Sequence, residues 1–101
     1  MLFLITCNDC ADGPAIRAKT LPLHQAHLPT VQRWIKAAGP LMGADGKPCG
    51  SFFLVEAESE ADARAFMARD PFHQAGLWAT IQVQACRATF GDWFGGRPAA
   101  S

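Results

Sequence analysis

The stretch Ser51-Phe52-Phe53-Leu54-Val55-Glu56-Ala57 is the clearest β-strand signal in this chain of 101 residues. It is rich in aromatic and β-branched side chains, which pack well on a pleated surface. The turn residues Asp45-Gly46-Lys47-Pro48 precede it, as expected between two strands. We therefore place a strand at residues 51–57, and the flanking segments have to fit beside it.

Downstream of this strand the sequence predicts a helix and a last strand. Ser59 stands three residues before Asp62, which is the spacing of a capping box with Asp in place of the usual Glu. The Ala-rich segment that follows is typical of a helix, which we expect to end near Asp70-Pro71. From Leu77 to Arg87 apolar and polar residues alternate, which indicates a half-buried strand. Its apolar face carries Ile81, Val83 and Ala85, and its polar face carries Thr80, Gln82 and Gln84.

Upstream of the central strand we expect a long helix from Ala15 to Ala38. Its apolar residues recur at mostly three- to four-residue intervals. Pro22 would suit the first turn of this helix, after a Thr20 cap. Pro29 falls inside the pattern and is expected to kink or restart the helix. Gly39-Pro40 is expected to end it.

The remaining segments complete the element order. Leu2 to Cys7 is an apolar run that predicts a strand buried on both faces, and Leu41 to Ala44 is a short apolar piece before the turn. The order β-α-β-β-α-β predicts an α+β domain of ferredoxin-like type, with an antiparallel sheet and both helices on one face. We expect one domain over residues 1–94 and a flexible tail over residues 95–101. Two helices leave one sheet face uncovered, so the sequence predicts a homodimer in which a second copy covers it.

Composition and charge exclude several classes of function. Nine basic residues balance nine acidic ones without forming a basic block, which argues against nucleic acid as a partner. The segment from Met1 to Cys7 lacks the basic start and the length of a signal peptide. No run approaches the roughly 20 apolar residues that span a bilayer. We therefore expect a cytoplasmic protein with no membrane partner. Tyrosine is absent, which excludes a tyrosine acid.

Cys7 and Cys10 form a C-x-x-C motif between a strand and a helix, which is where thioredoxin-like redox sites lie. The neighbouring Asp9 should raise a thiol pKa and so disfavour the reactive thiolate. A zinc site would need two further ligands at a recognisable spacing, whereas Cys49 and Cys86 are isolated. We expect reduced, non-catalytic thiols, and a redox or zinc site stays as the alternative.

The histidines and nearby charged residues suggest a second kind of site. His24 and His27 are three residues apart and could bind a metal from one helix face, but we favour one functional and one surface histidine. Arg17 precedes His24 by seven residues, about two helical turns, so both can face one cleft. His73 is expected to face solvent. Asp70 ends a helix, where the dipole disfavours a carboxylate, which suggests a partner such as a histidine.

Taken in order, these pieces resemble the YciI-like (YCII-related) protein family. The resemblance covers about residues 1 to 90 and rests on Asp9, Arg17, Pro22-x-His24, Ala38-Gly39-Pro40, Gly50-Ser51, Asp70-Pro71-Phe72 and Ala75-Gly76-Leu77. It implies a fold of the dimeric α/β-barrel type, with His24 and Asp70 as the active-site pair. One branch of this family is a dehydrochlorinase acting on a chlorinated hydroxyquinol, and the fold is similar to that of muconolactone isomerase.

Two functions from different classes fit these residues. The first is a cofactor-independent lyase, isomerase or dehydrochlorinase, in which His24 is the general acid and base and Asp70 orients it. Its substrate would be a small molecule, such as an aromatic or lactone-like compound, with Arg17 supplying positive charge for an anionic intermediate. The second is a non-catalytic small-molecule binding or accessory protein with the same pocket. The remaining predicted substrate-binding residues are Ser51, Asp9 and the apolar walls Phe52, Phe72 and Trp78.

Overall fold

The computed structural model describes residues 1–92, so the tail expected over residues 95–101 lies outside the described residues. The elements are β1 (Leu2–Asp9), α1 (Gly13–Val31), the 3₁₀ turn η1 (Gln32–Trp34), β2 (Ile35–Met42), β3 (Pro48–Glu56), α2 (Glu60–Ala68), α3 (Pro71–Gln74) and β4 (Trp78–Cys86). The predicted ferredoxin-like α+β order is confirmed, with α3 as an added short helix.

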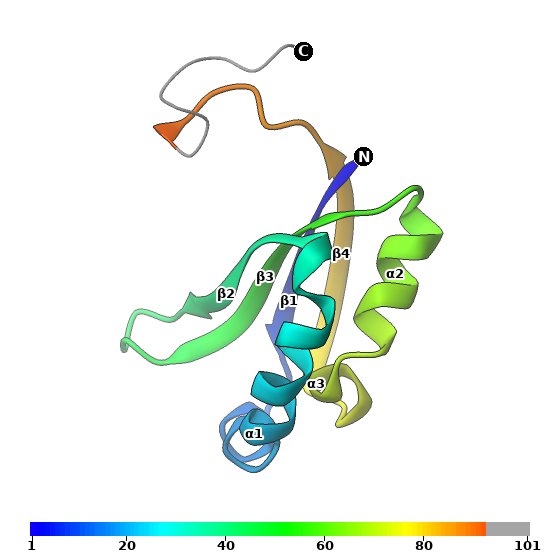
Figure 1. The fold of residues 1–101 in the computed structure, drawn as a ribbon. Coiled ribbons are helices and arrows are strands. Elements are labelled where there is room, and N and C mark those ends of the chain that lie inside the picture. Colours follow the sequence, from blue (N-terminus) through cyan, green and yellow to red (C-terminus); the bar gives the residue numbers. More distant parts are fainter. Residues whose placement is uncertain (93–101) are drawn as a thin grey trace.

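The four strands form one antiparallel sheet in the order β2-β3-β1-β4, and the helices lie on one side of it (Figure 1). Ile5 of β1 lies opposite Phe53 of β3 and Val83 of β4. Because side chains alternate between the two faces of a strand, these three residues point to the same side. This side packs against the helices, and the opposite side of the sheet is open.

The hydrophobic core lies between the sheet and the helices. The buried strand residues are Phe3, Ile5, Cys7, Phe53 and Val55, and the helices add Val31, Ala63, Phe66 and Met67. On β1 the neighbouring Leu4 points the other way and is 39% exposed. The expectation that β1 is buried on both faces is therefore wrong for residues 1–92 of a single chain, because no helix in this part covers its second face.

Local signals placed the start of α2 correctly but misplaced the start of α1. The backbone N–H of Asp62 donates to the Ser59 side chain at 3.1 Å, as the capping-box spacing predicts. Helix α1 begins at Gly13, with Pro14 in its first turn, so Thr20 is not a cap and Pro22 is not in the first turn. The helix also neither ends nor restarts at Pro29, but continues to Val31. No helix within residues 1–92 is long and apolar enough to cross a bilayer.

Residues 35–38, expected at the end of the first helix, belong instead to β2. Ala38 of β2 pairs with Phe53, and Gly39 pairs with Phe52. Alanine and lysine are good helix formers, but helix propensity is a weak preference, and pairing along the edge of β3 outweighs it. As a strand, β2 contributes Ala38, Gly39 and Pro40 to the wall of a cavity beside α1.

Candidate functional site

Asp70 lies in the corner between α2 and α3, where it serves as the N-cap of α3. Its Oδ1 accepts a hydrogen bond from the backbone N–H of Phe72 at 2.8 Å. The expectation that this carboxylate lies at an unfavourable helix C-terminus is wrong, because α2 ends at Ala68 and Asp70 begins α3. Asp70 is only 2% exposed. Its carboxylate is held by the capping bond from Phe72 and by a second hydrogen-bond partner.

The second partner of Asp70 is His24, in the middle of α1. Nδ1 of His24 lies 2.9 Å from Oδ1 of Asp70, and the His24 side chain is 13% exposed. An ionised carboxylate can only accept hydrogen bonds, so the bond requires the hydrogen on Nδ1. In neutral His24 this leaves Nε2 with a free lone pair. The contact between α1 and α3 therefore brings together two residues 46 positions apart.

Two phenylalanine rings hold the imidazole of His24. The Phe72 ring stacks on it with centroids 4.1 Å apart, and the Phe53 ring meets it edge-on at 6.5 Å. Trp78 packs edge-on against Phe72, with the two ring centroids 6.0 Å apart. These contacts place His24 against an apolar surface that excludes water from one of its faces.

Arg17 and Asp9 form a nearly buried ion pair beside these rings. Nε of Arg17 donates to Oδ2 of Asp9 at 2.6 Å, and Nη2 donates to Oδ1 at 3.0 Å. Nη2 also donates to the carbonyl oxygen of Gly50 at 2.7 Å and to Oγ of Ser51 at 3.1 Å. The guanidinium carbon lies 5.3 Å from the centre of the Phe72 ring. Asp9 thus balances much of the charge that Arg17 was expected to offer an anionic intermediate.

These groups surround a cavity of about 280 Å³ between α1 and the strands β2 and β3. Helix α1 contributes Arg17 and His24, β3 contributes Ser51 and Phe53, and α3 contributes Phe72. Asp9 and Trp78 are not among the lining residues and contact the site through Arg17 and Phe72. The cavity therefore has a few polar groups on a mainly apolar wall, as is usual for small-molecule sites.

Phe52 does not belong to this cavity, which corrects its predicted role as a wall. It pairs with Gly39 and points to the open face of the sheet, while Phe53 points to the helices. Sequence reasoning missed Phe53. The signal was present, because alternation places residues 51, 53 and 55 on one face, so Ser51 and Phe52 cannot both line the same site.

None of the cysteines, and neither His27 nor His73, is among the residues that line this cavity. No group of three potential metal ligands occurs within residues 1–92, and all four cysteines are free. Burial raises the pKa of the Cys7 thiol to about 12, and the carboxylates of Asp70 and Asp9 add to the effect. The protonated thiol is a poor nucleophile. His73 is half-buried rather than solvent-facing, and its Nδ1 has no hydrogen-bond partner within the described chain.

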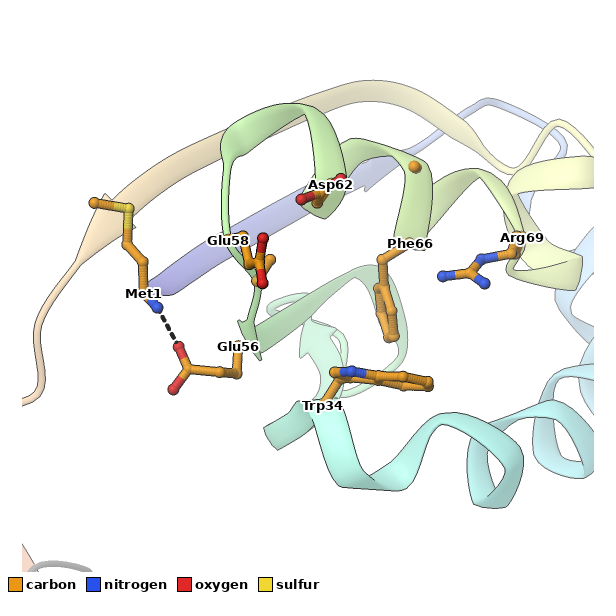
Figure 2. A pocket seen from close by; sticks show the side chains of 9 residues that line it. Met1, Trp34, Glu56, Glu58, Asp62, Phe66 and Arg69 are labelled. Atoms are coloured by element: carbon orange, nitrogen blue, oxygen red, sulfur yellow. Dashed lines mark ion pairs between the residues drawn. The ribbon is translucent and has the colours of Figure 1, made fainter.

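A larger hollow, of about 450 Å³, lies beyond the C-terminal end of α1 (Figure 2). Figure 2 shows the Phe66 ring directed toward Trp34, with Glu58, Asp62 and Arg69 around the two rings. These three charged residues are exposed, and exposed charges are common on any protein surface. The smaller cavity instead has a buried carboxylate, a histidine and a paired arginine beside it, so we place the candidate site there.

Comparison with known proteins agrees with the α+β fold described above. The YCII-related domain model matches residues 1–87. Protein YciI of Escherichia coli O6:H1 is 29% identical over 98 residues, which covers 89% of this chain and all of that protein, and the protein of the same name in Shigella flexneri matches equally.

A solved structure is also similar, with a TM-score of 0.80 and 34% identity over 92% of this chain and 98% of the other. It is the 5-chloro-2-hydroxyhydroquinone dehydrochlorinase from Burkholderia phenoliruptrix AC1100, in complex with 2,5-dihydroxybenzoquinone. This relative combines the same fold with a small ring compound as its ligand.

Proposed function

We propose that this chain, which belongs to the family of YCII-related domain proteins, is an enzyme that moves protons on a small hydroxylated ring compound. The observation that carries the proposal is the bond between Nδ1 of His24 and Oδ1 of Asp70, which leaves Nε2 free at the edge of a cavity. Histidine is the side chain whose usual pKa suits proton transfer near neutral pH.

In this proposal Asp70 orients the imidazole and stabilises the imidazolium that forms when Nε2 takes a proton. Its own position is secured by the backbone N–H of Phe72, so it keeps a second hydrogen bond throughout. Phe53 and Phe72 exclude water around His24, which strengthens electrostatic interactions at that point. The residues thus suit a step in which one proton leaves a substrate hydroxyl or acidic C–H and returns elsewhere on the ring.

The dehydrochlorinase at 34% identity supports a hydroxylated ring as the substrate class. Loss of hydrogen chloride from such a ring balances when two hydroxyl protons leave, one of them adds to the chlorine-bearing carbon, the other passes to a base, and chloride leaves from that carbon. His24 would be that base. The alternative, a binding or accessory protein that uses the same cavity without turnover, predicts ligand binding alone.

The test is chloride release from 5-chloro-2-hydroxyhydroquinone under anaerobic conditions, which keep air from oxidising the compound. Wild-type protein should release chloride at least a hundredfold faster than the same solution without protein, because a positioned general base contributes about 10²–10⁴-fold. An ion-selective electrode measures the rate. Release at the uncatalysed rate would contradict a dehydrochlorinase. Saturable binding of the compound without release would favour the accessory protein.

We also propose that the protein is a homodimer joined through the open face of the sheet. Leu4 is 39% exposed there, and Phe52 and Leu54 of the neighbouring strand are half-buried. The polar side chains on β4 can form hydrogen bonds across the interface or line a hydrated centre; they are Thr80, Gln82 and Gln84. Burial of these apolar side chains against a second copy would stabilise the pair.

Leu4→Asp is expected to convert this dimer into a monomer. The substitution places a carboxylate from each copy in the interface, and an unpaired buried charge costs several kcal/mol. Multi-angle light scattering at micromolar concentration should return twice the chain mass for wild type and one chain mass for the variant. Leu23→Asp is the matched control, since Leu23 is 64% exposed on α1 and should leave the mass unchanged. A monomeric wild type would contradict the proposal.

A further inference from the structure

The geometry points to Ser51 as a hydrogen-bond donor to the ligand, and to Arg17 as the positioning residue that aims the Ser51 hydroxyl. The group that Ser51 would bind is a carbonyl or enolate oxygen. This inference rests on the proposed function only in taking the cavity beside His24 as the binding site.

Ser51 has a hydroxyl hydrogen to spare. The residue is 5% exposed and lines the cavity from the helix-facing side of β3. Its Oγ accepts a hydrogen bond from Nη2 of Arg17 at 3.1 Å, while no acceptor within residues 1–92 takes the hydroxyl hydrogen. Buried hydroxyl groups usually use their hydrogen. A ligand oxygen in the cavity would supply the missing acceptor.

Arg17 sets the direction of that hydroxyl. Both Nε and Nη2 are held by the Asp9 carboxylate, which fixes the plane of the guanidinium. A charged donor on one side of Oγ directs the hydroxyl hydrogen away from it, and a hydroxyl that accepts such a bond becomes a better donor. Arg17 therefore acts on the ligand through Ser51.

Gly50 makes this arrangement possible. A Cβ on Gly50 would collide with the carbonyl oxygen of Cys7 on the paired strand, so only glycine allows the two strands to approach this closely. The Gly50 carbonyl oxygen accepts from the same Nη2 at 2.7 Å. The backbone beside Ser51 is thus tied directly to Arg17, and the Ser51 side chain has little freedom to move away from it.

The cavity then offers two complementary polar groups. Nε2 of neutral His24 can accept a hydrogen bond from the ligand, and Ser51 can donate one. The Phe53 ring, which contacts His24 edge-on, is part of the same cavity wall. A matching ligand has an acidic hydrogen near a carbonyl or enolate oxygen, as in a hydroxylated quinone. A ring compound that has neither a carbonyl nor an enolate oxygen would leave the Ser51 hydroxyl without an acceptor, so it should bind weakly.

The test is a double-mutant cycle on Ser51→Ala and Arg17→Lys, with 2,5-dihydroxybenzoquinone as the probe and isothermal titration calorimetry as the measurement. Ser51→Ala should weaken binding about tenfold, the value of one buried hydrogen bond. Arg17→Lys keeps the charge but loses the planar fork, so it should weaken binding as well. The double variant should bind no more weakly than the weaker single variant, because both changes remove one interaction.

Arg64→Lys is the matched control, since Arg64 is exposed and, within residues 1–92, pairs only with Glu60 of its own helix. Circular dichroism confirms that each variant is folded. If Arg17→Lys does not fold, the probe affinity of Ser51→Ala alone tests whether Ser51 is the hydrogen-bond donor. Equal affinity of Ser51→Ala and wild type, or no binding by wild type at millimolar probe, would overturn the inference. Additive losses in the cycle would overturn the positioning role of Arg17.

Failure of this inference is distinct from failure of the proposed function. If wild type releases chloride and Ser51→Ala binds the probe normally, the proposed activity is supported and Ser51 is not the hydrogen-bond donor. If Ser51→Ala loses probe binding while wild type releases no chloride, Ser51 is supported as the hydrogen-bond donor and the catalytic proposal is wrong.

Discussion

Replacing His24 by asparagine is expected to lower chloride release from 5-chloro-2-hydroxyhydroquinone by about 10²–10⁴-fold, the usual contribution of a general base. Asparagine can still donate to Oδ1 of Asp70, but it has no nitrogen that takes a proton. The measurement is kcat for the variant and wild type, with probe binding measured in parallel. Probe affinity should fall by about tenfold at most, because one hydrogen bond to Nε2 is lost while Ser51 and the apolar wall remain.

His27→Asn is the matched control for this substitution. His27 lies three residues further along α1, and no side-chain hydrogen bond is formed by its imidazole within the described chain. It should keep full activity. A purely structural bond between His24 and Asp70 predicts the reverse pattern for His24→Asn: a lower melting temperature with kcat unchanged. That pattern would remove His24 from the mechanism.

Replacing Asp9 by asparagine is expected to lower the free energy of unfolding by about 3 kcal/mol, since breaking a buried ion pair leaves one charge uncompensated. The Arg17 side chain is 15% exposed and that of Asp9 is 7% exposed, so little water can take the place of the lost carboxylate. The neutral acceptors at Gly50 and Ser51 cannot balance the guanidinium charge. Urea unfolding followed by circular dichroism measures the difference.

Asp12→Asn is the control for Asp9→Asn. Asp12 is exposed, stands next to the start of α1 and forms no side-chain cap bond, so its replacement should change the unfolding free energy by less than about 0.5 kcal/mol. Equal stability of Asp9→Asn and wild type would show that the ion pair contributes nothing net. It would also weaken the view that Arg17 is rigidly held beside Ser51.

Much of the fold follows from local sequence patterns. Alternation over residues 77–87 predicted β4 and its two faces, and Ser59 predicted the start of α2, because each signal depends on neighbours within one element. The second strand was predicted but placed too late, at residues 41–44, whereas β2 begins at Ile35. Residues 35–38 contain alanine and lysine, which are compatible with a helix, and only pairing with β3 makes them a strand.

The role of Asp70 at the site also depended on tertiary contacts. From the sequence Asp70-Pro71 was interpreted only as the end of a helix, although Asp followed by Pro also matches the N-cap and first position of a new helix, which is how α3 begins. Its pairing with His24 was implied by resemblance to a family rather than by spacing. In the structure the pair forms where α1 contacts α3.

The sequence by itself determined which faces of the strands are apolar, where α2 begins and that two helices must cover one side of a sheet. These properties depend on residues close together in the chain, whose spacing sets their direction. Only the tertiary structure decided that Phe53 rather than Phe52 faces His24, and that Asp9 pairs with Arg17. The physical reason is that strand register and helix packing set those contacts, and both depend on residues far apart in the chain.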